Sequence, residues 1–227
     1  MMTLYSYFRS STAYRVRIAL NLKGMNYKIV PVNILKGEQH EDDYRRINPL
    51  GGVPALLHNG QVLTQSLAMI GYLDDLRPEP PFLPGDAVER FYVRQMAQVI
   101  ATEIHPLTNL KVVNTLRDDY GLDEKARASW TKKWLVEGIA AFETLLEKQG
   151  RSGNFVLDDR VSVADLCLIP QMYSLRRNGV DLSPYPLCRR IEAHCLGLKP
   201  FRDAAPETQP DTPDGLEQIH GPSFSAA

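Results

Sequence analysis

Cysteine is scarce in this sequence. Three cysteines occur among the 227 residues, and no two of them form a C-x-x-C pair. An odd and sparse set argues against the disulfide framework of a small secreted protein and against a cysteine-based metal site. We interpret Cys167, Cys188 and Cys195 as free thiols that pack between helices in a reducing compartment. No histidine pairs with Cys, Asp or Glu at metal-ligand spacing, so we predict no metal.

Long apolar runs and an excess of one charge are also lacking. No stretch has the length and hydrophobicity needed to span a bilayer, and the N-terminus lacks the apolar core of a signal peptide. The formal net charge is −1, and basic residues are scattered rather than clustered. These features favour a cytoplasmic protein that binds neither membrane nor nucleic acid.

The first eighty residues read as a compact α/β unit. A strand at 3–7 precedes a helix at about 12–23, and a second β-rich stretch (27–34) contains Pro31, which suits an edge strand. A polar segment then reads as a short surface helix. Asn59-Gly60 between two apolar runs predicts a hairpin with a type I′ turn. A helix follows from Ser66 and ends before Pro78.

The rest of the chain reads differently. Four prolines and a glycine in 77–86 mark a linker, which we place at 81–86 between a domain at 1–80 and one at 87–205. Residues 87–205 show only helical periodicity, and "VSVADL" (161–166) predicts a capping box in which Ser162 and Asp165 begin a helix. The proline-rich residues 206–227 are predicted to be extended or disordered.

Three consecutive hydroxyl residues stand where a thioredoxin-type redox protein would carry C-x-x-C. Any one of Ser10, Ser11 and Thr12 could simply cap the helix. Three together, after Arg9, suggest an anion site, because a helix N-terminus offers free N–H groups and partial positive charge. Suppose that the anion is the cysteine thiolate of a ligand. Lowering the pKa of that thiol from ~8.5 to about 6.5 requires that the site stabilise its charged form by roughly 2.7 kcal/mol. A helix terminus gives about 0.3–2 kcal/mol, and one hydroxyl bond to a charge adds roughly 1.5–3.

Six separated motifs carry a resemblance to a known family. The motifs are "SSTAYRVRIALNLKG", "NPLGGVPAL", "LTQSLAMIGYLDDLRPEP", "IHPLTNLKV", "VSVADLCLIPQ" and "VDLSPYPLCRRI". They occur in the order seen in zeta-class glutathione transferases, among which the sequence looks most like the maleylacetoacetate and maleylpyruvate isomerases. The resemblance implies a thioredoxin-like domain followed by an all-helical domain, with glutathione as cofactor and a homodimer as the assembly.

The resemblance also implies a set of glutathione-binding residues. Ser10, Ser11 and Thr12 are expected against the glutathione sulfur, with Ser10 stabilising the thiolate. The backbone of Val53, held by a cis Pro54, is expected to pair with the cysteinyl unit. Gln65 and Ser66 are expected to hold the γ-glutamyl end, and Gln39 is a further candidate for contacting the peptide.

Arginine is the expected partner of a dicarboxylate substrate. Arg9 and Arg176 are assigned this role through the resemblance, although spacing alone favours a solvated helix face or a surface ion pair for each. His105 and Asn109, four residues apart on one helical face, are expected to line the substrate cleft; a structural histidine near Pro106 is the alternative. We assign Arg15 and Arg17 to structure, since alternate helix positions cannot share one face.

Two departures from the family pattern matter. The usual S-S-C has become Ser10-Ser11-Thr12, which removes an enzymic thiol and resembles the maleylpyruvate subgroup. Gly71 replaces a glutamate that is common in its helix. The implied activity is glutathione-dependent cis–trans isomerisation of maleylacetoacetate to fumarylacetoacetate in tyrosine and phenylalanine catabolism. Maleylpyruvate isomerisation, general glutathione transfer, dehalogenation of α-halo acids and a non-catalytic scaffold are the alternatives.

Overall fold

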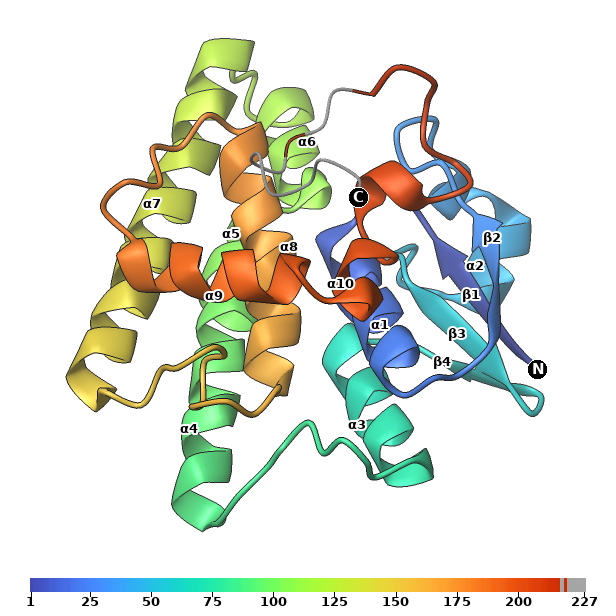
Figure 1. Cartoon of the computed structure of the whole chain (residues 1–227). Coiled ribbons are helices and arrows are strands. Elements are labelled where there is room, and N and C mark those ends of the chain that lie inside the picture. Colours follow the sequence, from blue (N-terminus) through green and yellow to red (C-terminus); the bar gives the residue numbers. More distant parts are fainter. Residues whose placement is uncertain (217–218, 220–227) are drawn as a thin grey trace. The chain divides into compact units, whose positions relative to one another are not determined.

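The computed structural model describes residues 1–216 and residue 219, and the chain divides into two compact units. Of the described residues, the first unit comprises Met1–Phe82 together with residues 196–216, and the second comprises Leu83–Cys195 and Ile219. The elements of both are labelled in Figure 1. The boundary after Phe82 falls inside the predicted linker, but the return of the C-terminal residues to the first unit was not predicted.

The first unit is built on a four-stranded sheet with the order β2-β1-β3-β4. Strand β1 (Met2–Ser6) pairs in parallel with β2 (Tyr27–Pro31) and antiparallel with β3 (Ala55–His58), which pairs antiparallel with β4 (Gln61–Leu63). Strand β2 lies at the edge, as Pro31 predicts. Asn59 and Gly60 join β3 to β4 with positive φ angles of 49° and 76°, which fits the predicted type I′ turn.

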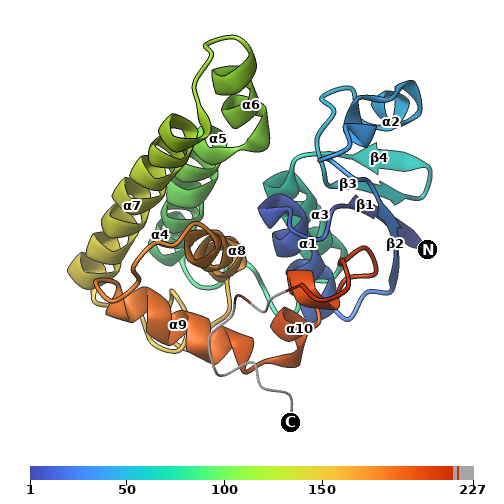
Figure 2. The same cartoon turned by 90° about the horizontal axis from the view of Figure 1, so that it is seen from above.

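Helices α1 (Ser11–Leu22) and α3 (Ser66–Leu76) pack together against the sheet (Figure 2). The polar segment after β2 forms a 3₁₀ turn, η1 (Glu38–His40), and a short helix, α2 (Asp42–Ile47). Eight consecutive residues of α1, from Ala13 to Leu20, are buried. A helix that packs on a sheet and is covered all round needs a second partner besides α3.

That second partner is the C-terminal segment, which we define as residues 199–213. It contains helix α10 (Lys199–Arg202), which contacts α1, and the 3₁₀ turn η3 (Pro206–Thr208). Within it, Gln209 is buried and its Nε2 donates to Ala205 O at 2.7 Å. The prediction of an extended or disordered tail is therefore wrong for 206–216, where local hydrogen bonds organise the chain despite its prolines. The rest of the predicted tail, apart from 219, lies outside the described residues.

The second unit is helical, as predicted. Its helices are α4 (Ala87–Gln98), α5 (His105–Thr108), α6 (Leu110–Asp118), α7 (Glu124–Gln149), α8 (Val163–Arg177) and α9 (Pro186–Leu196), with a π-helical turn, η2 (Val99–Ile104), between α4 and α5. Gly138 of α7 allows a close approach to η2, because a Cβ there would lie 2.2 Å from Ile104 Cγ1.

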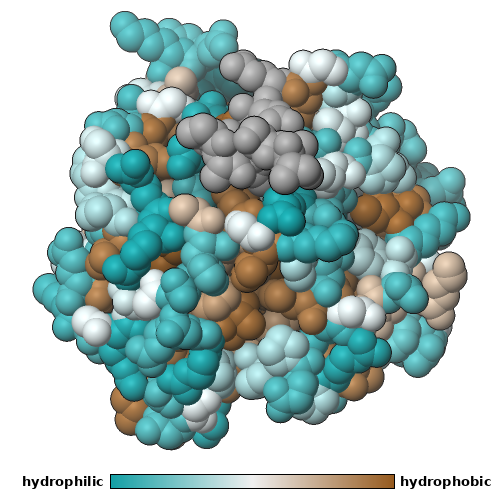
Figure 3. All heavy atoms as spheres, viewed as in Figure 1, coloured by the Kyte–Doolittle hydropathy of each residue, from teal (hydrophilic) through white to brown (hydrophobic). Residues whose placement is uncertain are grey.

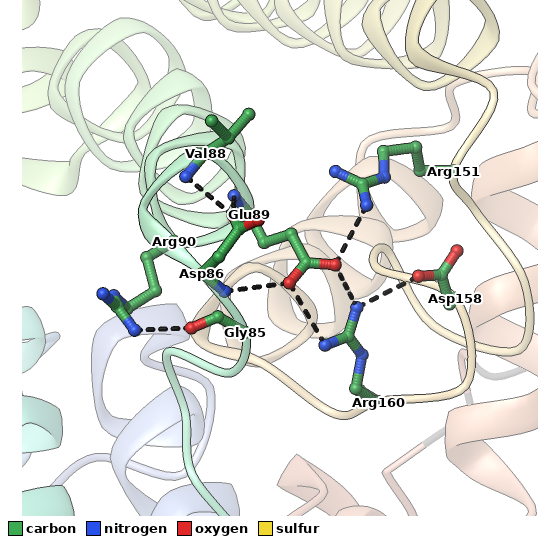
Figure 4. Close-up of polar contacts among 8 residues, drawn as sticks. All are labelled: Gly85, Asp86, Val88, Glu89, Arg90, Arg151, Asp158 and Arg160. Carbon is green, nitrogen blue, oxygen red and sulfur yellow. Dashed lines mark hydrogen bonds and ion pairs between the residues drawn. The ribbon is translucent and has the colours of Figure 1, made fainter.

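The start of α4 is fixed by a polar network (Figure 4). Asp86 Oδ1 accepts from the N–H groups of Val88 and Glu89, and the Glu89 carboxylate accepts from Asp86 N–H, all at 2.9 Å. The same carboxylate accepts from Arg151 at 2.9 Å and Arg160 at 2.6 Å. These bonds, led by that from Arg160, lower the pKa of Glu89 to about 2. One carboxylate thus caps a helix and ties it to the α7–α8 connection.

The predicted capping box of α8 is present. The Asp165 carboxylate accepts from the backbone N–H and the hydroxyl of Ser162, both at 2.8 Å, and from Val156 N–H at 2.7 Å. Burial nevertheless raises the pKa of Asp165 to about 6. The three cysteines are buried in α8 and α9 and form no disulfide with one another, and burial raises the pKa of the Cys188 and Cys195 thiols. They serve packing, as predicted.

Hydrophilic side chains cover much of the face drawn in Figure 3, with apolar residues in separate patches. Among the described residues, no helix combines the length and apolar character needed to cross a membrane. The same part of the chain contains no group of three or more His, Cys, Asp or Glu side chains that could hold a metal ion.

Candidate functional site

The start of α1 presents the hydroxyl cluster. Ser10 is the N-cap residue, and its Oγ accepts from Ala13 N–H at 3.2 Å. Its carbonyl oxygen accepts from Tyr14 N–H at 2.8 Å, which begins the helix. The N–H groups of Ser11 and Thr12 belong to the first turn and have no partner within the helix. This end of α1 can therefore donate hydrogen bonds to an anion.

Thr12 connects the cluster to the loop before β3. Its Oγ1 donates to Val53 O at 2.8 Å and lies 2.9 Å from Ser10 Oγ. A hydroxyl has one proton, and that of Thr12 is given to the carbonyl. Ser10 must then be the donor in the bond between the two hydroxyls. The Val53–Pro54 peptide bond is cis, as the resemblance implied.

A buried arginine faces the start of α3. Arg15 on α1 has 2% of its surface exposed, and its Nη1 donates to Ser66 Oγ at 3.5 Å. Its Nε has no hydrogen-bond partner among the described residues. A buried guanidinium that is so weakly paired is unfavourable unless an anion compensates it. Ser66 begins α3, and Gln65 before it has a φ of 67°, an uncommon conformation for a residue other than glycine.

Gln39 lies in η1, and its side-chain oxygen is buried without a hydrogen-bond partner among the described residues. An unpaired acceptor of this kind can receive a hydrogen bond from a peptide N–H. Together with the orphaned Arg15 Nε and the open start of α1, it gives donors and an acceptor that suit a small peptide carrying a carboxylate and a thiolate. The residues present therefore fit glutathione.

Arg9 lines a cavity of about 340 Å³ in the first unit. Its guanidinium lies over the Phe8 ring, 5.0 Å from the ring centre, and its Nε is buried without a partner in the described part of the chain. Asn33, Glu38 and Asp211 also line this cavity. A guanidinium with unused donors in a cavity can hold a carboxylate.

The remaining predicted substrate residues belong to the second unit. Asn109 Nδ2 lies 3.2 Å from His105 Nε2, so the structure brings this predicted pair together. Asn109 also caps α6, because its Oδ1 accepts from Lys111 N–H at 2.9 Å. Arg176 forms a two-point ion pair with Glu192, with Nε–Oε1 and Nη2–Oε2 distances of 3.1 and 2.5 Å. Two of the three guanidinium nitrogens of Arg176 therefore already bind the Glu192 carboxylate.

Arg17, which the sequence analysis assigned to structure, holds the loop before Ser10. It is fully buried, and burial lowers the pKa of its guanidinium to about 10, which leaves it charged at neutral pH. Its Nη2 donates to Phe8 O at 2.9 Å, its Nη1 to Ser6 Oγ at 3.1 Å, and its Nε to Ala204 O at 2.9 Å. No sequence signal marks this role, because Ala204 comes from the far end of the chain.

Comparison with known proteins agrees with this geometry. Residues 1–75 match the family model "Glutathione S-transferase, N-terminal domain". A thioredoxin-like unit with a hydroxyl-lined helix start and a separate helical unit defines a glutathione transferase. The chain is 43% identical to a maleylpyruvate isomerase of Ralstonia sp. over 93% of its own length and all of the relative. It is 42% identical to the maleylacetoacetate isomerase of Mus musculus, covering 94% and 96% of the two chains.

Solved structures give the same result. The holo structure of a bacterial zeta-class maleylpyruvate isomerase superposes with a TM-score of 0.91 at 42% identity, over 93% of this chain and all of that one. A maleylacetoacetate isomerase from Methylobacterium extorquens AM1, with bound malonate and glutathione, gives a TM-score of 0.90 at 39% identity, over 93% and 99%. The chain belongs to the zeta class of glutathione transferases.

Proposed function

We propose that this protein is a glutathione-dependent cis–trans isomerase that converts maleylacetoacetate to fumarylacetoacetate. The observation that carries the proposal is the open start of α1, where Ser10, Ser11 and the first N–H groups form a donor set for a thiolate. When bound, glutathione supplies a thiolate that adds to the cis double bond, permits rotation in the resulting enolate, and leaves with the trans bond formed.

The chain's residues have three tasks in this scheme. Ser10 and Ser11 donate hydrogen bonds to the sulfur and favour its charged form. Val53, Gln65, Ser66 and Arg15 hold the peptide, with the Arg15 charge directed at its γ-glutamyl carboxylate. Arg9 binds a substrate carboxylate and stabilises the negative charge that develops on the substrate oxygen.

The second unit supplies further substrate-side groups in this proposal. His105 and Asn109, whose Nε2 and Nδ2 atoms lie 3.2 Å apart, are the candidate polar groups for contact with a substrate oxygen. Arg176 keeps only Nη1 unengaged by Glu192, which leaves it a single-point rather than a two-point contact for a substrate carboxylate. A homodimer remains the expected assembly, and sedimentation of the purified protein tests it.

Maleylpyruvate isomerisation is the second candidate. Two observations favour it: Thr12 stands in place of the cysteine common in the family, and the Ralstonia relative, 43% identical, is a maleylpyruvate isomerase. The chemistry is the same on a shorter dicarboxylate, so the two candidates differ in substrate length.

One assay separates these functions. The purified chain is given maleylacetoacetate or maleylpyruvate, with no glutathione or with glutathione at one hundredth of the substrate concentration. We expect turnover of a cis-dicarboxylate only with glutathione, and total free glutathione unchanged at the end. Stoichiometric loss of glutathione would indicate a transferase or a dehalogenating enzyme, and inactivity on both substrates would reject the isomerase proposal.

A further inference from the structure

The C-terminal segment reaches the loop that precedes the hydroxyl cluster. Phe8 N–H donates to Asp211 Oδ2 at 2.9 Å, across 203 residues of sequence. On the other side of the same residue, Phe8 O accepts from Arg17 Nη2 at 2.9 Å. Both polar groups of the Phe8 backbone are thus held from outside the loop, immediately before Arg9 and Ser10.

The segment that carries Asp211 is itself well anchored. Phe201, Ala204 and Ala205 are fully buried, and Arg17 Nε and Asn21 Nδ2 of α1 donate to Ala204 O and Pro200 O, both at 2.9 Å. At the end of η3, Thr208 Oγ1 donates back to Ala205 O at 2.9 Å, and beyond η3, Thr212 Oγ1 donates to Pro206 O. Asp211 therefore belongs to a segment that is hydrogen-bonded to α1, the helix that Ser10 caps.

Asp211 also shares a cavity with Arg9. Both residues line the cavity of about 340 Å³, together with Pro213. The second carboxylate oxygen of Asp211 and the Nε of Arg9 are buried, and neither has a hydrogen-bond partner in the described part of the chain. The C-terminal segment consequently forms one wall of the space in which Arg9 acts.

We propose that Asp211 is a positioning residue, which holds the loop 7–10 through Phe8 N–H and so sets the place of Ser10 and Arg9 for thiolate stabilisation and substrate binding. This inference rests on the proposed function for its catalytic consequence, but its structural consequence is independent of any ligand. A small displacement of groups that must orient reactants lowers the rate steeply, by about 100-fold for 1 Å.

The test compares Asp211→Ala with Asp211→Asn and with the control Asp214→Ala. The asparagine keeps an oxygen that can accept from Phe8 N–H, whereas the alanine does not. Asp214 is exposed and three residues further along, so its loss changes the net charge equally. Hydrogen exchange of the Phe8 amide, measured without glutathione, reports the bond directly.

We expect Asp211→Ala to speed exchange at Phe8 and to lower kcat by about 10-fold or more. The pKa of the bound glutathione thiol is expected to rise in the same variant. Asp211→Asn and Asp214→Ala are expected to stay within about 2-fold of the wild type in kcat and exchange.

Wild-type exchange and kcat in Asp211→Ala would overturn the proposal, as would equal impairment in Asp211→Asn or Asp214→Ala. If the wild-type protein isomerises neither substrate, the proposed function fails while the exchange measurement still decides whether Asp211 holds the loop.

Discussion

The hydroxyl of Thr12 donates its only proton to the carbonyl oxygen of Val53 at 2.8 Å, and so cannot also donate to a sulfur. We therefore propose that Thr12 joins two parts of the glutathione site, and that Ser10 rather than Thr12 is the hydroxyl that turns toward the sulfur. Ser10 donates to Thr12 in turn, at 2.9 Å. When Ser10 turns its proton toward an arriving anion, Thr12 still fixes the loop that carries Val53.

Replacing Thr12 tests this link. Thr12→Ser keeps the hydroxyl and is expected to retain kcat, whereas Thr12→Val removes both hydrogen bonds. We expect Thr12→Val to lose about 0.5–1.5 kcal/mol of stability per bond and to bind glutathione more weakly. Urea denaturation and calorimetry measure the two effects. Equal behaviour of the serine and valine variants would contradict the assignment.

Arg176→Ala should lower the stability of the fold as well as weaken substrate binding. The variant leaves the Glu192 carboxylate, whose side chain is 2% exposed, without its partner. Breaking a buried pair costs roughly 3–5 kcal/mol, and we expect about 3 because Arg176 is 28% exposed. The double variant Arg176→Met with Glu192→Gln should recover most of that loss in chemical denaturation. A stable Arg176→Ala protein with only a raised KM would show that the pair contributes little to the fold.

Two glycines in helices should respond to alanine in opposite ways. Gly71 in α3 is exposed, and a Cβ there would meet nothing within 4 Å. Gly71→Ala is therefore expected to stabilise the protein by about 0.5–1 kcal/mol. Gly138→Ala places a Cβ against the Ile104 side chain and is expected to cost about 1–3 kcal/mol. Thermal unfolding of the two variants and the wild type shows whether each substitution raises or lowers stability. A change in the same direction for both variants would contradict this prediction.

Asp165 should make stability depend on pH in the acid range. Its folded pKa of about 6 lies above the ordinary value of 3.8, so the folded state binds more protons between these values. Its contribution to stability is therefore complete below pH 3.8 and is lost as the pH rises through 6. Asp165→Asn does not titrate, so its stability relative to wild type should improve by up to about 3 kcal/mol from pH 4 to pH 7. Parallel curves of unfolding free energy against pH would contradict this.

Local sequence signals predicted much of the fold. The Asn59-Gly60 hairpin, the edge strand with Pro31, and the start of α8 at Ser162 and Asp165 all follow from chemistry within a few residues. The same is true of Ser10 as the cap of α1 and of His105 beside Asn109. In each case the interacting groups are close in sequence, so spacing alone is informative.

The missed residues depend on contacts between distant parts of the chain. Spacing places Arg15 and Arg17 on different faces of α1 and assigned both to structure, without showing what each one contacts. Both are buried because α3 covers one side and the C-terminal segment covers another. The proline-rich composition of that segment gave no sign that it folds back onto α1. Asp211 could therefore not be assigned to the site from the sequence.

The central claim is that the start of α1 stabilises a glutathione thiolate. The most direct measurement is an ultraviolet titration of the thiolate absorbance of glutathione bound to the wild-type protein and to Ser10→Ala. We expect a bound thiol pKa of about 6.5 in the wild type, and a return most of the way to ~8.5 in Ser10→Ala. A bound thiol pKa near the free value in the wild-type protein, or one that Ser10→Ala leaves unchanged, would contradict the account.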